Sequence, residues 1–158
     1  MRGWWLALLL APSFAQSPPA GVVSPSGTLA VNVRVDREGR PEYSVLRGAA
    51  TIVDWSRLGF ILADQPKLER NFAITRATQR ALDETWEQPW GERRFVPSHC
   101  RELRVIFTER SGRELDVVFR VFDDGIGFRY EFPDQPMLRE VNIVDELTEF
   151  AISVARRA

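Results

Sequence analysis

Carboxylates and tryptophans are concentrated in ten residues of this chain, DETWEQPWGE at positions 83–92. The four acids, Asp83, Glu84, Glu87 and Glu92, are of the type that supplies an acid and base pair for the hydrolysis of a glycosidic bond. Two arginines follow directly and could neutralise these acids in ion pairs instead. Because neighbouring residues of a strand alternate between its two faces, closeness in sequence does not make an acid–base pair. We therefore favour a structural or contact role for the four acids over catalysis.

The two tryptophans of this segment, Trp86 and Trp90, allow two interpretations. If they are exposed, their flat faces, together with Glu92, could contact a sugar ring or another domain. If they are buried, they would close one end of a β-sandwich, which we favour because large aromatic side chains more often fill cores than bind ligands. Trp86, Trp90 and Glu92 are the candidate contact residues under the first interpretation.

The chain contains one histidine, His99, and one cysteine, Cys100, which limits other chemistry. One cysteine excludes an internal disulfide and a cysteine-based zinc site, and predicts a buried structural thiol. A Ser-His-Asp triad would have to use His99, and the sequence has no nucleophile motif of the G-x-S-x-G type. Neither residue therefore indicates a nucleophilic triad or a zinc site.

The elements that must position these residues are predicted to be strands, because apolar and polar residues alternate. The clearest strand predictions are residues 29–35, 42–46, 103–108, 114–122 and 127–132. The last three form a meander with two short turns. Apolar residues occur on both faces of 114–122, which favours a sandwich over an open sheet. The fold class predicted is all-β with antiparallel strands.

The first fifteen residues predict export. Arg2 precedes an apolar run at 4–11, and small residues lead to a cleavage position near Ala15, which is typical of a secretory signal. The run is too short to span a bilayer. We therefore expect a periplasmic or secreted chain without a membrane span. Residues 16–27 are rich in Pro, Ser and Gly and are predicted to be flexible.

The composition is that of an ordinary globular domain, with 44% hydrophobic and 27% charged residues. The formal net charge is −1, and basic residues are interspersed with acidic ones. Since no basic stripe is present to bind phosphates, nucleic acid is excluded as an expected partner.

Four stretches cover nearly all of the chain beyond the signal: SPSGTLAVNVRVDREGRPEYSV (24–45), SRLGFIL (56–62), DETWEQPWGERRFVPSHCRELRV (83–105), and GRELDVVFRVFDDGIGFRYEFP (112–133) with DELTEF (145–150). In this order and spacing they resemble the amino-terminal domain of glycoside hydrolase family 97, which includes exported bacterial α-glucosidases. The third and fourth stretches are the more specific.

The resemblance implies part of a β-supersandwich of the galactose-mutarotase-like type over residues 28–150, with an atypical tail at 151–158. In this family the domain precedes a (β/α)₈ barrel that carries the catalytic carboxylates, and a calcium ion assists there. Family substrates are α-glucosides or α-galactosides. The resemblance thus implies a non-catalytic domain with no catalytic residue, no metal ligand and no cofactor in this chain, and with calcium expected only in the full-length enzyme.

Two alternatives remain open at this stage. One is a stand-alone carbohydrate-binding module in which Trp86 and Trp90 hold an oligosaccharide. The other is a non-functional truncated fragment, because the ending AISVARRA does not resemble the continuation of the family. The choice between glucoside and galactoside, and between inversion and retention, would be made in the barrel.

Overall fold

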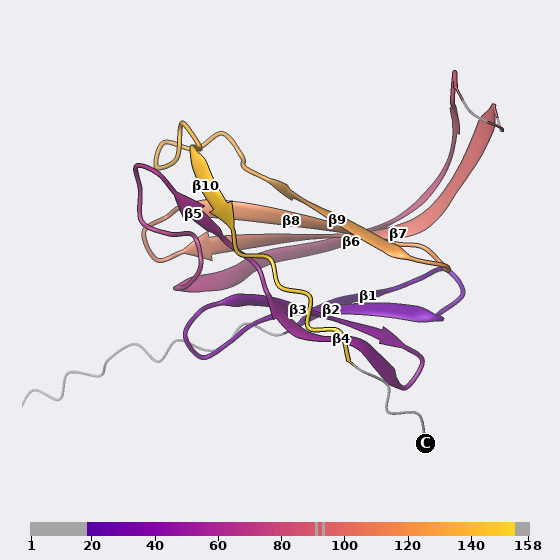
Figure 1. Ribbon diagram of the computed structural model, residues 1–158, viewed down its shortest axis with the longest axis horizontal. Helices are drawn as coiled ribbons and strands as arrows, with labels where there is room; N and C mark the ends of the chain where they lie inside the picture. Colours follow the sequence, from indigo (N-terminus) through magenta and orange to yellow (C-terminus); the bar gives the residue numbers. More distant parts are fainter. Residues whose placement is uncertain (1–18, 91, 93, 154–158) are drawn as a thin grey trace, which may run out of the picture.

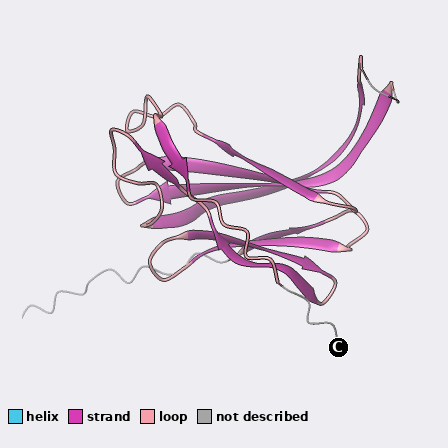
Figure 2. Cartoon of the chain, viewed as in Figure 1, coloured by secondary structure: helices cyan, strands magenta, loops and turns pink. Residues whose placement is uncertain are grey.

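The computed structural model describes residues 19–90, 92 and 94–153, so the predicted signal segment lies outside the described residues. Figure 2 shows strands joined by loops throughout this part of the chain. The strands are β1 (Ala20–Val23), β2 (Leu29–Val35), β3 (Pro41–Arg47), β4 (Ala50–Arg57), β5 (Phe60–Leu62), β6 (Phe72–Glu87), β7 (Phe95–Glu109), β8 (Glu114–Val121), β9 (Ile126–Glu131) and β10 (Ile143–Glu146). Every pairing between them is antiparallel, which confirms the predicted fold class. No helix long and apolar enough to cross a membrane is found among the described residues.

Two four-stranded sheets face each other and form a sandwich (Figure 1). One sheet has the order β1-β2-β3-β4 and the other β6-β7-β8-β9, while β5 and β10 form a small third sheet. The alternating apolar residues of β2 and β8 point into the space between the large sheets, as the period of two predicts. The largest fully buried side chains are Tyr43, Leu58, Leu68, Leu103, Phe107, Leu115 and Phe119.

The prediction that residues 16–27 are flexible is wrong for Ala20–Val23, which form β1. This strand pairs with β2 from Ala20↔Val33 to Val23↔Ala30, and Val22 lies in the core. The hydroxyl of Ser24 accepts a hydrogen bond from the Leu29 amide and fixes the following turn. Two of the four residues of β1 are small, so the strand has too little apolar patterning to be seen in the sequence.

The last described residues lie along the open edge of β4. The amide of Asp54 donates to the carbonyl of Ala151 at 2.8 Å, and Val53 forms a bridge with Ile152. The Tyr43 hydroxyl donates to the carbonyl of Glu149 from inside the core. Residues 151–153 of the predicted tail therefore extend the sandwich, and 154–158 lie outside the described residues.

Strands β6 and β7 form a hairpin that is much longer than the sandwich requires. They pair from Phe72↔Glu109 to Glu87↔Phe95, whereas β8 pairs with β7 only up to Arg101. The unsupported end, residues 81–87 and 95–100, is called the arm below. Figure 1 shows the arm curving away from the sheet that contains β1 to β4.

Candidate functional site

The candidate contact residues lie at the free end of the arm. Trp86 is 50% exposed, Trp90 is 83% exposed, and Glu92 is also exposed. Phe95, at 58% exposure, lies opposite Glu87 at the end of the ladder. The interpretation that the tryptophans close one end of the sandwich is therefore wrong. They lie beyond the sandwich because the hairpin that carries them extends past its last supporting strand.

The acids of the arm are solvated or paired rather than arranged as catalytic groups. Glu87 accepts a hydrogen bond from Nε of Arg94 at 2.7 Å, and both side chains are more than half exposed. The carboxylate of Asp83, which is 83% exposed, lies 3.6 Å from Nδ1 of His99. Exposure and pairing with basic side chains are features of a solvated, ion-paired surface, which agrees with the structural role favoured for these acids.

The arm extends the sheet β6-β7-β8-β9, whose outer face is the one turned away from the sheet β1-β2-β3-β4. This outer face continues along one side of the arm, called its inner side. Leu82 pairs directly with Cys100, and Trp86 pairs directly with Val96. Because side chains alternate between the two faces of a strand, these four residues lie on the same face as Glu102. Leu82 and Cys100 are buried where the arm bends, which confirms the predicted buried thiol. Burial is the largest influence on Cys100 and raises the pKa of its thiol.

Glu102 is held beneath two arginines on this outer face. Its Oε1 accepts from Nε of Arg80 at 2.7 Å, and its Oε2 accepts from Nε of Arg120 at 2.9 Å. Burial acts to raise the pKa of this carboxyl, but the hydrogen bonds and charges of Arg80 and Arg120 outweigh it and lower the pKa below its ordinary value. The carboxylate of Glu102 is thus stabilised in its ionised form.

A second cluster on the same face centres on Arg104. Its guanidinium donates to Oδ2 of Asp116 and to Oε2 of Glu131, and Arg129 donates to Oε1 of Glu131. Burial raises the pKa of Asp116 despite the opposing effect of Arg104. The other oxygen of this carboxylate, Oδ1, is buried and has no hydrogen-bond partner among the described residues.

Sequence reasoning missed these two clusters, although a signal was present. Arg104, Val118 and Arg129 are directly opposite one another on three adjacent strands, and Ile106, Asp116 and Glu131 form the next row. Aligning the predicted meander strands by their turns would have placed the opposite charges side by side.

The calcium ion implied by the family resemblance finds no suitable donor set in this part of the protein. Among residues 19–90, 92 and 94–153, no group of three or more His, Cys, Asp or Glu side chains is placed to hold a metal ion. The paired carboxylates of the outer face already accept hydrogen bonds from arginines. Calcium in the full-length enzyme stays a prediction, and it concerns residues outside this chain.

The comparisons with known proteins agree on one family. The family described as "Glycosyl-hydrolase 97 N-terminal" matches residues 22–158. A curated protein from Streptomyces bingchenggensis (strain BCW-1), named "Probable retaining alpha-galactosidase", is 29% identical over 126 residues, which are 78% of this chain and 20% of the relative.

Solved structures give the same result. A glycoside hydrolase family 97 enzyme from Pseudoalteromonas sp. strain K8, in complex with panose, superposes with a TM-score of 0.77 at 37% identity. The match covers 84% of this chain and 20% of that enzyme. A β-arabinopyranosidase also superposes at 0.77, with 28% identity over 85% of this chain and 21% of its own.

The chain thus spans about a fifth of the length of the proteins that it matches. The family match covers most of its residues, and the fold agrees with the solved structures. The chain belongs to glycoside hydrolase family 97, as its amino-terminal domain.

Proposed function

We propose that this chain is the non-catalytic amino-terminal part of an exported α-glycoside hydrolase, which packs against a catalytic barrel and contacts its carbohydrate substrate. The substrate class is an α-glucoside or an α-galactoside, and calcium would be bound by the remainder of the enzyme. The predicted signal over residues 1–15 supports export. The match to only a fifth of each relative supports a catalytic apparatus elsewhere in the enzyme.

The arm is the single observation that carries this proposal. Three large aromatic side chains, Trp86, Trp90 and Phe95, are at least half exposed at the end of a hairpin that the sandwich does not need. Tryptophan is enriched among the residues that dominate binding energy at interfaces, where it fills a pocket of the partner. An arm of this kind is suited to reach a second domain and form one wall of its sugar pocket.

The stand-alone binding module is the second candidate, and exposure of the tryptophans also favours it. The two proposals differ in what the isolated chain does. A binding module holds an oligosaccharide without the barrel, whereas an interdomain arm has no function until the barrel is present. Neither proposal assigns hydrolysis to the isolated chain.

The experiment is a chimera in which residues 22–153 replace the matched fifth of the Pseudoalteromonas enzyme. We expect the chimera to hydrolyse nitrophenyl α-glucoside or α-galactoside, and the isolated 158-residue chain to be inactive. Trp90→Ala in the chimera should lower kcat/KM by about tenfold, the scale of losing a contact worth about 1.4 kcal/mol. Trp55→Ala, on the outer face of the other sheet, is the matched control and should change kcat/KM by less than about twofold.

Hydrolysis by the isolated chain, confirmed against a mock preparation, would refute the proposal. Equal activity of the Trp86→Ala, Trp90→Ala and parent chimeras would show that these tryptophans of the arm do not contribute to the sugar pocket. Maltooligosaccharide or galactooligosaccharide binding by the isolated chain, lost in Trp86→Ala, would favour the binding module.

A further inference from the structure

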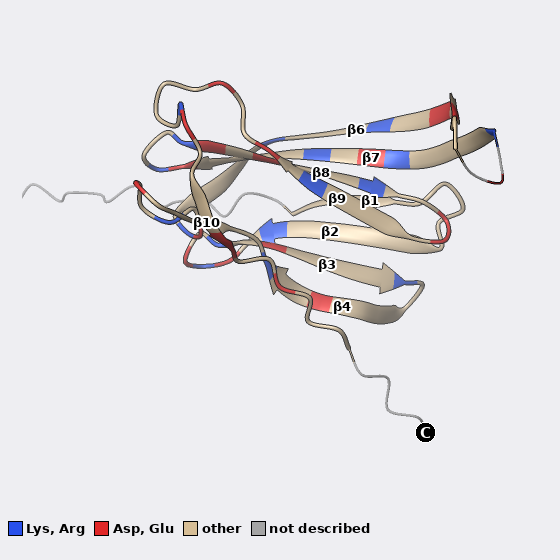
Figure 3. Ribbon diagram, turned by 45° about the horizontal axis from the view of Figure 1, so that its top comes forward, with Lys and Arg blue, Asp and Glu red and all other residues tan. Residues whose placement is uncertain are grey.

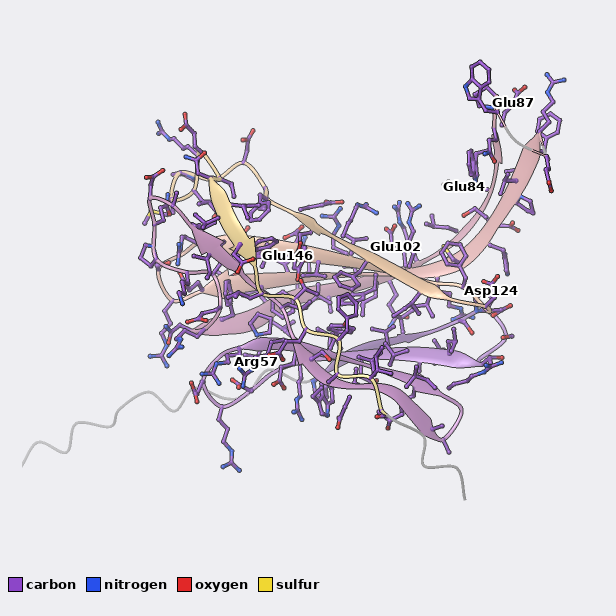
Figure 4. The ribbon with its side chains drawn as sticks, viewed as in Figure 1. Arg57, Glu84, Glu87, Glu102, Asp124 and Glu146 are labelled. Atoms are coloured by element: carbon purple, nitrogen blue, oxygen red, sulfur yellow. The ribbon has the colours of Figure 1, made fainter. Side chains whose placement is uncertain are left out.

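The arm and the outer face of the sheet β6-β7-β8-β9 together form a concave surface, called the concave face below. Figure 1 shows the arm curving toward this outer side, so that it forms a wall beside the sheet. Figure 4 places Glu84 on the inner side of the arm and Glu102 on the sheet beside it. Glu84 and Trp86 follow Arg80 at alternate positions of β6, so they share the face that carries the arginine clusters.

Carboxylates form the lower layer of this surface and arginines the upper layer. The side chains of Glu102 and Asp116 are 4% and 7% exposed, whereas that of Arg80 is 62% exposed. Arg104, Arg120 and Arg129 are also more than a third exposed. Figure 3 shows basic and acidic positions beside one another along β7. The surface thus presents guanidinium N–H groups whose charge is balanced from beneath.

Such a surface fits a partner rich in hydrogen-bond acceptors. A guanidinium has five N–H donors, and bonding to Glu102 or Glu131 uses only some of them and holds each arginine in place. Ordered arginines lose less side-chain entropy on binding, and arginine is enriched in protein interfaces. Backbone carbonyls and carboxylates of a folded partner supply the matching acceptors.

We infer that the concave face is the docking seat for the remainder of the glycoside hydrolase, with the exposed arginines binding carbonyl and carboxylate acceptors and Trp86 packing at its rim. This inference rests on the proposed function, which supplies the catalytic part as the partner. In the relatives, four fifths of the chain lies outside the match, and this remainder is large enough to cover the concave face. A seat of this kind buries a face that the isolated chain leaves open.

The test measures solvent access with single cysteines. In a Cys100→Ala background, Thr78→Cys and Glu84→Cys place thiols on the exposed part of the concave face, and Ala49→Cys places one on the turn between β3 and β4. Maleimide labelling rates are compared between the 158-residue chain and the chimera described above, each checked for a cooperative thermal transition. We expect labelling at both concave positions to be at least about tenfold slower in the chimera, as in an interface that excludes water. The Ala49→Cys rate should change by less than about twofold, since an exposed turn far from the seat stays in contact with solvent.

The outcomes separate this inference from the proposed function. An active chimera in which both concave positions label at the rate of the isolated chain would overturn the docking seat and leave the proposed function intact. An inactive chimera with protected concave positions would support the seat and count against the proposed function. Protection that appears in the isolated chain on raising its own concentration, or on adding maltooligosaccharide, would assign the face to a second copy or to a sugar and overturn the inference.

Discussion

Glu102 and Asp116 lie on the same face and are bonded to arginines, yet the structure predicts a much larger loss of stability from neutralising Glu102 than from neutralising Asp116. Glu102→Gln removes a carboxylate whose two oxygens each accept a hydrogen bond from a guanidinium, at 2.7 and 2.9 Å. The glutamine amide keeps one acceptor and turns an NH₂ donor toward the other arginine. Asp116→Asn removes a carboxylate that has one bonded and one unbonded oxygen.

The magnitude for Glu102→Gln follows from the burial of the pair. Hydrogen bonds to charged groups contribute about 1.5 to 3 kcal/mol each when buried, but Arg80 and Arg120 are 62% and 37% exposed and can be hydrated again. After this discount we expect the free energy of unfolding to fall by about 2 kcal/mol. For Asp116→Asn we expect a change within about 1 kcal/mol, because the lost bond to Arg104 is offset by removal of a buried charge.

The pH dependence distinguishes the two sites. The pKa of Glu102 is lowered on folding, so its stabilisation is present above the ordinary carboxyl pKa of about 4.3 and is lost as pH falls through the lower folded value. The pKa of Asp116 is raised, so its charge costs stability above that raised value and protonation in acid relieves the cost.

Urea unfolding of the 158-residue chain, followed by tryptophan fluorescence at about pH 7 and about pH 3, measures both effects. The deficit of Glu102→Gln should be smaller at the lower pH. An equal deficit at both pH values, or a loss in Asp116→Asn as large as that in Glu102→Gln, would refute the reasoning.

Two further predictions concern the framework. Arg113→Met should lower the free energy of unfolding by about 3 to 5 kcal/mol, because it leaves the carboxylate of Glu109 buried without its partner. The side chains of Arg113 and Glu109 are at most 6% exposed. The double variant Arg113→Met with Glu109→Leu should recover part of this loss, measured by thermal unfolding. Gly39→Ala should destabilise more than Gly27→Ala, although both glycines have φ of 77°, since a Cβ on Gly39 would lie 2.6 Å from the Asn71 nitrogen and one on Gly27 meets nothing within 4 Å. Equal urea midpoints for these two variants would contradict the steric argument.

The sandwich was predictable because its strands bury one face. The alternation at 29–35 and 114–121 places Val31, Val33 and Leu115 in the core, and the structure confirms the strands and the meander. The second of the two predicted meander turns, at 123–125, is present as well. Gly125 is not among the glycines with positive φ, and Asp123 accepts a hydrogen bond from the Ser26 amide in the turn between β1 and β2.

The arm was not predictable because most of β6 has no buried face. Over Phe72–Glu87, the buried side chains are those of Phe72 and Leu82, so the period-two pattern that marks a strand is absent. The backbone ladder to β7 supports the strand instead. Whether Trp86 is buried depends on where the supporting sheet ends, and β8 stops pairing at Arg101, a fact of tertiary structure that local composition does not encode.

The outer face of the second sheet shows why apolar residues on both sides of β8 do not require a third sheet. Val118 is fully buried on that face, directly between Arg104 and Arg129 of the neighbouring strands. The aliphatic stems of arginines can cover an apolar side chain while their guanidinium groups stay in water. A face covered in this way presents charged groups to solvent, and it can bind a partner without first exposing apolar surface. The same arginines that cover Val118 are therefore the groups best placed to make the docking contact that we propose.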